Sequence, residues 1–153
     1  MIESNHGFTY AINFVDRSSR LYAVYFMRGR EHPNVLDAAK TFMRDHAHLL
    51  TKTRVPGVVD LWHCDNAGEF TDAKLEAWAA AKGIQRSFST EDVHESNGAA
   101  ERCWGVLQRA MRAMLAHTGG DEQQARFWPY LMLVAVHCHN NGRCNSDGSL
   151  KCK

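Results

Sequence analysis

The sequence predicts a single α/β domain in which a mixed sheet is flanked by helices. Two strand-like runs joined by five residues indicate an antiparallel hairpin, and two later strand-like runs alternate with helix-like segments, which favours parallel pairing. The length of 153 residues fits one domain. With 44% hydrophobic and 23% charged residues, the composition is that of a globular protein, and a collagen-like or disordered chain is excluded.

The N-terminal half is expected to contain a hairpin, a helix and a third strand. Aromatic and β-branched residues dominate residues 8–15 and 21–27, which form the two arms of the hairpin. Apolar residues then recur at helical spacing over residues 35–46. The run 58–64 has the apolar content of a buried strand. This strand delivers Asp65 at its carboxyl end, a common position for functional side chains.

The C-terminal half is expected to contain three helices and one more strand. Thr71 can cap a helix that ends near Gly83, and residues 84–89 resemble a short strand. A long helix is expected over residues 99–116. Pro129 suits the first turn of a last helix, whose continuous apolar run predicts that it is largely buried.

The domain is expected to span residues 1–140, followed by a flexible tail at 141–153 that is rich in Gly, Asn and Ser. The formal net charge is +1, so any affinity for nucleic acid has to come from local clustering of basic residues. The five cysteines include no Cys-x-x-Cys pair, which argues against a zinc site or a disulfide framework. No leader or membrane-length apolar run is present, so an intracellular location without a membrane partner is expected.

The helix over residues 99–116 is amphipathic. Its apolar sector holds Cys103, and its polar sector holds Glu101. Two arginines, Arg109 and Arg112, share the polar sector with Glu101. They fit equally well with a solvated surface and with contacts to phosphate groups. Cys103 is expected to be a buried structural cysteine rather than a nucleophile, because it lies in the apolar sector.

Two motifs carry the two carboxylates. They read Asp65-Asn66-x-Gly68-Glu69-Phe70 and, after 35 residues between Asp65 and Glu101, Asn97-Gly98-x-Ala100-Glu101-Arg102. Together they resemble the catalytic core of retroviral and retrotransposon integrases, and the copia-type branch in particular. The resemblance implies an RNase H-like fold with DDE-type chemistry. In such a site, carboxylates hold two divalent ions that promote attack on a DNA phosphodiester.

The resemblance assigns roles to particular residues. It implies that Asp65 and Glu101 are catalytic residues and ligands of Mg²⁺ or Mn²⁺. It also implies that DNA, as element ends and as target, is the partner, and that the intact parent integrase is nuclear and homo-oligomeric. The expected DNA-binding residues are Asn66, Asn97, Arg102, Arg109 and Arg112.

A third carboxylate is the open question in this comparison. In the related cores the first Asp lies on the first of three antiparallel strands, a central strand between the hairpin and the strand that carries Asp65. Asp16 matches the turn between the second and third strands, so the first strand would lie at or before Met1. We therefore expect an N-terminally truncated core that is inactive alone. Two alternatives are a noncatalytic relic that binds nucleic acid or protein, and an RNase H-like nuclease.

Overall fold

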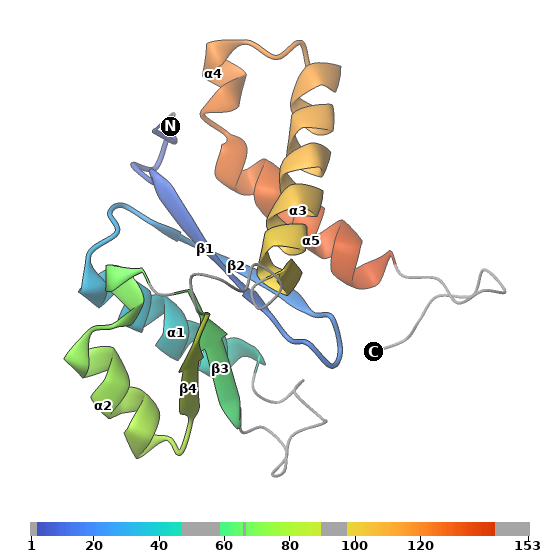
Figure 1. Cartoon of the computed structure of the whole chain (residues 1–153). Coiled ribbons are helices and arrows are strands. Elements are labelled where there is room, and N and C mark those ends of the chain that lie inside the picture. Colours follow the sequence, from blue (N-terminus) through green and yellow to red (C-terminus); the bar gives the residue numbers. More distant parts are fainter. Residues whose placement is uncertain (1–2, 47–58, 66, 90–97, 143–153) are drawn as a thin grey trace, which may run out of the picture.

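The computed structural model describes residues 3–46, 59–65, 67–89 and 98–142 (Figure 1). A hairpin and a helix come first, a parallel β-α-β unit follows, and helices end the described chain. The elements are β1 (Tyr10–Val15), β2 (Tyr22–Met27), α1 (His32–His46), β3 (Leu61–Cys64), the 3₁₀ turn η2 (Gly68–Phe70), α2 (Ala73–Ala81), β4 (Gln85–Phe88), α3 (Gly98–His117), α4 (Glu122–Ala125) and α5 (Trp128–Asn141). This order confirms the predicted α/β class. None of the helices in the described ranges is long and apolar enough to cross a membrane.

The hairpin forms as the sequence predicts, with β1 and β2 antiparallel along their whole lengths. Asp16 organises the connection, because its carboxylate oxygens accept hydrogen bonds from the backbone N–H groups of Ser18 and Ser19, at 3.4 and 2.6 Å. Arg20 closes the turn with φ of 60°, in the left-handed region that residues other than glycine seldom adopt. Asp16 is therefore a turn residue, as the sequence comparison indicates.

The second sheet consists of β3 and β4, which are parallel and are connected by α2. Asp72, and not Thr71, caps α2, since its carboxylate accepts a hydrogen bond from the Lys74 N–H at 3.2 Å. The Thr71 hydroxyl instead donates to the carbonyl oxygen of Gly68 at 3.0 Å and closes η2. The prediction of Thr71 as the cap is wrong. Thr71 and Asp72 both have side chains that can cap a helix, but the Thr71 hydroxyl is already bonded to η2, so Asp72 caps α2.

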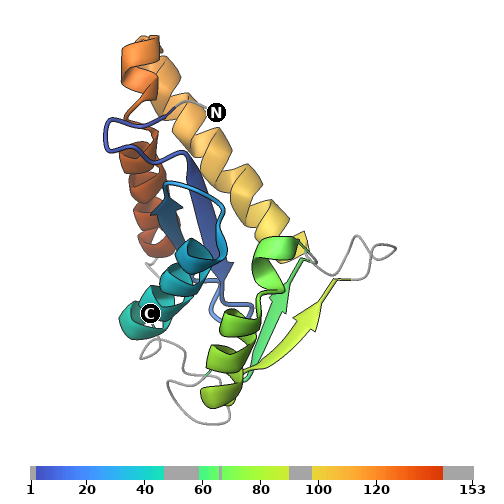
Figure 2. The ribbon, with the colours of Figure 1, turned by 90° about the vertical axis from the view of Figure 1, so that its left-hand side faces the viewer.

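Helices cover both faces of the hairpin (Figure 2). On one face, β2 packs against α3 and α5 around Cys103 and Leu107, which are both fully buried. On the other face, α1 contributes Val35 and Ala39 to a second buried cluster. A third cluster joins Ala79 of α2 and Ile84, which precedes β4, to Phe42 of α1. These clusters fix α3 on one side of the hairpin and α1 on the other.

The four strands found in the described ranges form two separate sheets, β1–β2 and β3–β4. β1 and β3 line the same cavity, and across it the ring centroids of Phe14 and Trp62 lie 5.8 Å apart. Backbone pairing between β1 and β3 is absent among the described residues. The break lies at the position where the sequence comparison puts a further, central strand.

The last helices differ from the sequence prediction. Tyr130, Leu133 and Val134 of α5 are nearly half exposed, whereas Met132 and Ala135 are buried. A continuous apolar run carries no periodicity that would reveal which side of the helix packs, so the prediction of a largely buried helix is wrong for the outer side of α5. The four-residue helix α4 is not predicted, because it is too short to show a periodic pattern.

Asn140 of α5 holds the outer edge of β2. Its side-chain oxygen accepts a hydrogen bond from the Tyr22 N–H at 3.0 Å, and its Nδ2 donates to the Tyr22 carbonyl oxygen at 2.8 Å. Replacing Asn140 by alanine would leave both backbone groups without these partners. We expect Asn140→Ala to lower the free energy of unfolding by about 1–3 kcal/mol, measured by urea denaturation. Asn141→Ala, on an exposed neighbour, is the control and should change it by less than about 0.5 kcal/mol.

Candidate functional site

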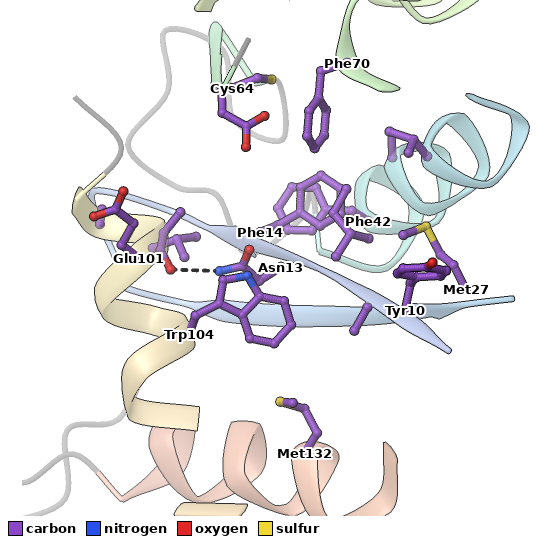
Figure 3. Close-up of a pocket in the computed structure, with 18 of the residues that line it drawn as sticks. Tyr10, Asn13, Phe14, Met27, Phe42, Cys64, Phe70, Glu101, Trp104 and Met132 are labelled. Carbon is purple, nitrogen blue, oxygen red and sulfur yellow. Dashed lines mark hydrogen bonds between the residues drawn. The ribbon is translucent and has the colours of Figure 1, made fainter. Parts of the chain in front are cut away.

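A cavity of about 1250 Å³ lies between the hairpin, β3 and α3 (Figure 3). Both carboxylates that the sequence singles out, Asp65 and Glu101, line it. They come from different elements, the end of β3 and the first turn of α3. The fold therefore places on one cavity two side chains that have 35 residues between them in the chain.

Asp65 follows β3 directly and is exposed. β3 is fixed by its parallel pairing with β4 and by Trp62, which packs against two of the buried clusters. Among the described residues, the carboxylate of Asp65 accepts one hydrogen bond, from the Ala67 N–H at 3.4 Å. This bond is long, so the described residues leave most of the acceptor capacity of the carboxylate available to a ligand.

Glu101 is exposed in the first turn of α3, and Figure 3 shows it beside the cavity. The start of α3 is tied to β1 by Asn13, whose Nδ2 donates to the Ala100 carbonyl oxygen at 3.1 Å. Farther along α3, Cys103 and Leu107 anchor the helix in the core. The sequence analysis did not identify Asn13, although a lone amide within an apolar strand is a usable signal for such a contact.

Two further carboxylates line the cavity but have other partners. Asp16 caps the hairpin turn, and Glu69 forms an ion pair with Arg30 at 3.2 Å. Among the described residues, no ion pair involves Asp65 or Glu101. These two are the carboxylates of the cavity that remain available for a cation.

The donor set suits a hard divalent cation. Carboxylate oxygens are the ligands that Mg²⁺ and Mn²⁺ prefer, and two exposed carboxylates on one cavity can bind such ions. No group of three His, Cys, Asp or Glu side chains that could hold a metal ion occurs in the described ranges. Within those ranges, the carboxylates that could contribute ligands at this cavity are Asp65 and Glu101.

The expected DNA-binding residues separate into three sets. Arg112 lines the cavity together with Glu101 and Gln108, on the same side of α3. Arg102 and Arg109 are exposed but are not part of the cavity lining. Asn66 and Asn97 lie outside the described residues. Gln108, which the sequence analysis does not single out, is an additional polar side chain that lines the cavity.

The two cysteines near the site are poor nucleophiles. Burial raises the pKa of both the Cys64 and the Cys103 thiol to about 11. At neutral pH both are therefore protonated, whereas thiol chemistry needs the thiolate. The full burial of Cys103 confirms its expected structural role.

Sequence relatives of the chain are retroelement polyproteins, and no family model matches it. The chain is 27% identical over 114 residues to the retrovirus-related Pol polyprotein from transposon TNT 1-94 of Nicotiana tabacum, which covers 74% of this chain. It is 31% identical over 94 residues to the Pro-Pol polyprotein of simian foamy virus type 3 (strain LK3), which covers 61% of this chain. The chain spans about 8% of the length of each of these relatives.

Solved structures with a similar fold are retroviral. A chain of the simian T-cell lymphotropic virus intasome in complex with PP2A regulatory subunit B56 gamma matches with a TM-score of 0.72 and 13% identity, over 97% of this chain and 49% of that chain. The catalytic core domain of BIV integrase matches with a TM-score of 0.62 and 17% identity, over 92% of this chain and 80% of that chain. At these identities the similarity establishes the fold. It confirms the resemblance that the sequence motifs indicate.

Proposed function

We propose that this chain, which has the fold of retroviral integrase catalytic cores, is the core of an integrase-type polynucleotidyl transferase acting on DNA phosphodiesters. The observation that carries this proposal is the position of Asp65 and Glu101 on one cavity. Similarity to Pol polyproteins supports it independently of geometry. The expected partners are element ends and target DNA, and the location of the intact protein is the nucleus.

The chemistry assigned to the cavity uses the carboxylates as ligands. Asp65 and Glu101 would hold Mg²⁺ or Mn²⁺, which when bound would stabilise the attacking and leaving oxygens of the phosphodiester. Arg112 and Gln108, which line the cavity on the same side of α3, would contact phosphate oxygens of DNA there. Asn13 acts as a positioning residue, because its bond to Ala100 fixes the turn of α3 that carries Glu101.

A homo-oligomer is also part of the proposal. Phe127, Tyr130, Leu133 and Val134 are exposed at spacings of three and four residues on one side of α5. Exposed apolar residues that share one helix side are typical of a surface for protein contacts. This surface is separate from the cavity and would leave Asp65 and Glu101 accessible in an assembly.

Removing either carboxylate should weaken binding of Mn²⁺. For Asp65→Asn and for Glu101→Gln we expect the Kd for Mn²⁺ to rise by at least about 10-fold, because loss of an anionic ligand should cost no less than loss of a residue that only orients a ligand. The measurement is the free Mn²⁺ signal in electron paramagnetic resonance during a titration. Glu76→Gln, an exposed acid on α2 outside the cavity, is the matched control and should bind as the unchanged chain does. An unchanged Kd in both site variants would contradict the metal site.

Arg112 and Arg109 offer a test of DNA contact at the cavity. We expect Arg112→Ala to weaken binding of duplex DNA and to lower the slope of log K against log salt by about 0.9, the value for one phosphate contact. Arg109→Ala is the matched control, since it removes the same charge from the same helix at a position outside the cavity lining. Equal effects of the two changes would show that only the net charge of α3 matters.

A noncatalytic nucleic-acid binding module is the second candidate. The observation that favours it is that the described residues hold no group of three metal-binding side chains, whereas integrase-type chemistry uses three carboxylates. The two candidates make the same prediction for Arg112 and differ in catalysis. Residues 1–153 alone are expected to be inactive, so the test compares them with a chain extended upstream by a strand that carries an Asp. Mg²⁺- or Mn²⁺-dependent joining of labelled DNA ends by the extended chain would support the catalytic core, and DNA binding without joining by both chains would support the module. Cleavage without joining would indicate a nuclease.

A further inference from the structure

The carboxylate of Glu69 lies close to Asp65 in the chain and lines the same cavity. The Glu69 side chain is only 21% exposed, and its Oε1 lies 3.2 Å from Nη2 of Arg30. A mostly buried carboxylate is costly without a partner of opposite charge. This ion pair therefore constrains Glu69 more than a contact between two fully exposed side chains would.

Arg30 is itself held in place from two directions. It belongs to the connection between β2 and α1, which Asn34 fixes by donating a hydrogen bond from its Nδ2 to the Gly29 carbonyl oxygen at 3.2 Å. The guanidinium of Arg30 also lies over the ring of Tyr10, 5.6 Å from its centroid. Arg30 is thus oriented on β1 and directs a donor to Glu69.

Glu69 is the middle residue of η2, the turn that follows Asp65. The Phe70 N–H donates to the Ala67 carbonyl oxygen at 2.9 Å, and the N–H of Ala67 contacts the Asp65 carboxylate. Phe70 and Tyr10 pack against the same buried cluster, and both line the cavity (Figure 3). The turn after Asp65 is thus attached to its surroundings at two adjacent residues, by an ion pair and by an apolar contact.

We propose that Arg30 is a positioning residue for the metal site, because through Glu69 it holds the turn that orients the Asp65 carboxylate. The inference rests on the proposed function, in which Asp65 is a metal ligand. Residues that orient a ligand raise the affinity for the metal although they do not touch it. The charge of Arg30 alone would act in the opposite direction, since it places a cation on the lining of a cation site.

Replacing Arg30 by alanine separates orientation from charge. If Arg30 positions the turn, the Kd for Mn²⁺ should rise by about threefold to tenfold, more than for an exposed ion pair and less than for a residue bonded directly to a ligand. If only charge matters, the Kd should fall, because a cation is removed and the Glu69 carboxylate is left free. The measurement is the free Mn²⁺ signal in electron paramagnetic resonance.

Two further variants complete the metal titration. Arg30→Lys keeps a cation opposite Glu69 but loses the planar contact with Tyr10, so it should recover most of the affinity. Arg44→Ala is the matched control, because Arg44 is also an exposed arginine in an ion pair, with Asp45 at 2.8 Å, and it does not line the cavity. Its Kd should equal that of the unchanged chain. Circular dichroism verifies that each variant folds.

Hydrogen exchange of η2 gives a readout without metal. The N–H groups of Phe70 and Thr71 close this turn by donating to the carbonyl oxygens of Ala67 and Gly68, at 2.9 and 3.1 Å. In Arg30→Ala both amide protons should exchange about twofold to fivefold faster, because loss of the ion pair favours local opening. The amide protons of the β1–β2 ladder should exchange at an unchanged rate.

Two results would overturn the inference and leave the proposed function standing. One is an Mn²⁺ affinity of Arg30→Ala that equals or exceeds that of the unchanged chain, while Asp65→Asn still weakens binding. The other is unchanged exchange of the Phe70 and Thr71 amide protons in Arg30→Ala. Failure of the unchanged chain to bind Mn²⁺ would instead contradict both the proposed metal site and the positioning role of Arg30.

Discussion

Phe14→Ala is expected to lower the free energy of unfolding by about 3 kcal/mol, measured by urea denaturation. Phe14 stacks on Phe42 with ring centroids 4.6 Å apart and also contacts Tyr25 and Trp62. Loss of a packed phenylalanine costs about 3–5 kcal/mol, and the lower end applies because the side chain is only partly buried. Since Phe14 links the hairpin to β3 through side-chain contact, the fluorescence of Trp62 should also change.

Phe14→Leu serves as the control for this variant. Leucine retains much of the apolar volume and should restore at least half of the lost stability. A loss below about 1 kcal/mol for Phe14→Ala would mean that the two sheets are held together by the helices, and that the ring contact across the cavity contributes little.

Leu107→Ala is expected to destabilise the chain by about 3–5 kcal/mol. Leu107 is fully buried where α3, α5 and β2 meet, so a cavity would remain that neighbouring side chains cannot fill. The volume-conserving change Leu107→Met should cost less than about 1.5 kcal/mol. Urea denaturation of the three proteins provides the comparison. Similar losses for alanine and methionine would show that shape, rather than lost apolar volume, decides the stability at this position.

Much of the fold could be predicted from local sequence. Alternating aromatic and β-branched residues on both sides of Asp16 indicate the hairpin, and the 3.6-residue period of α3 correctly separates Cys103 from Glu101. The outer side of α5 could not be predicted, because an apolar run looks the same whether one side or both sides pack. The capping residue of α2 could not be predicted either, because Thr71 and Asp72 are both suitable caps and the backbone geometry decides between them.

The candidate site was less accessible to sequence reasoning than the fold. The pairing of Asp65 with Glu101 came from the resemblance of two motifs, since nothing local relates a strand end to a helix start that lies beyond 35 intervening residues. The helical projection placed Arg109 and Arg112 in one sector, but only Arg112 lines the cavity. The difference arises because the position of β1 and β3 decides which part of the polar sector of α3 faces the cavity.

The two hydrogen bonds between the Asn140 side chain and the Tyr22 backbone clamp α5 to β2, and this clamp affects the order of folding. The hairpin is closed by a short connection and can form within microseconds, whereas the clamp joins residues 118 positions apart. Closing so long a loop costs more entropy, and the contacts that offset this cost form only after α3 and α5 have docked. During synthesis from the N-terminus, the outer edge of β2 is therefore made early and covered late. Until α5 emerges from the ribosome, this edge is a site at which a nascent chain can aggregate or engage a chaperone.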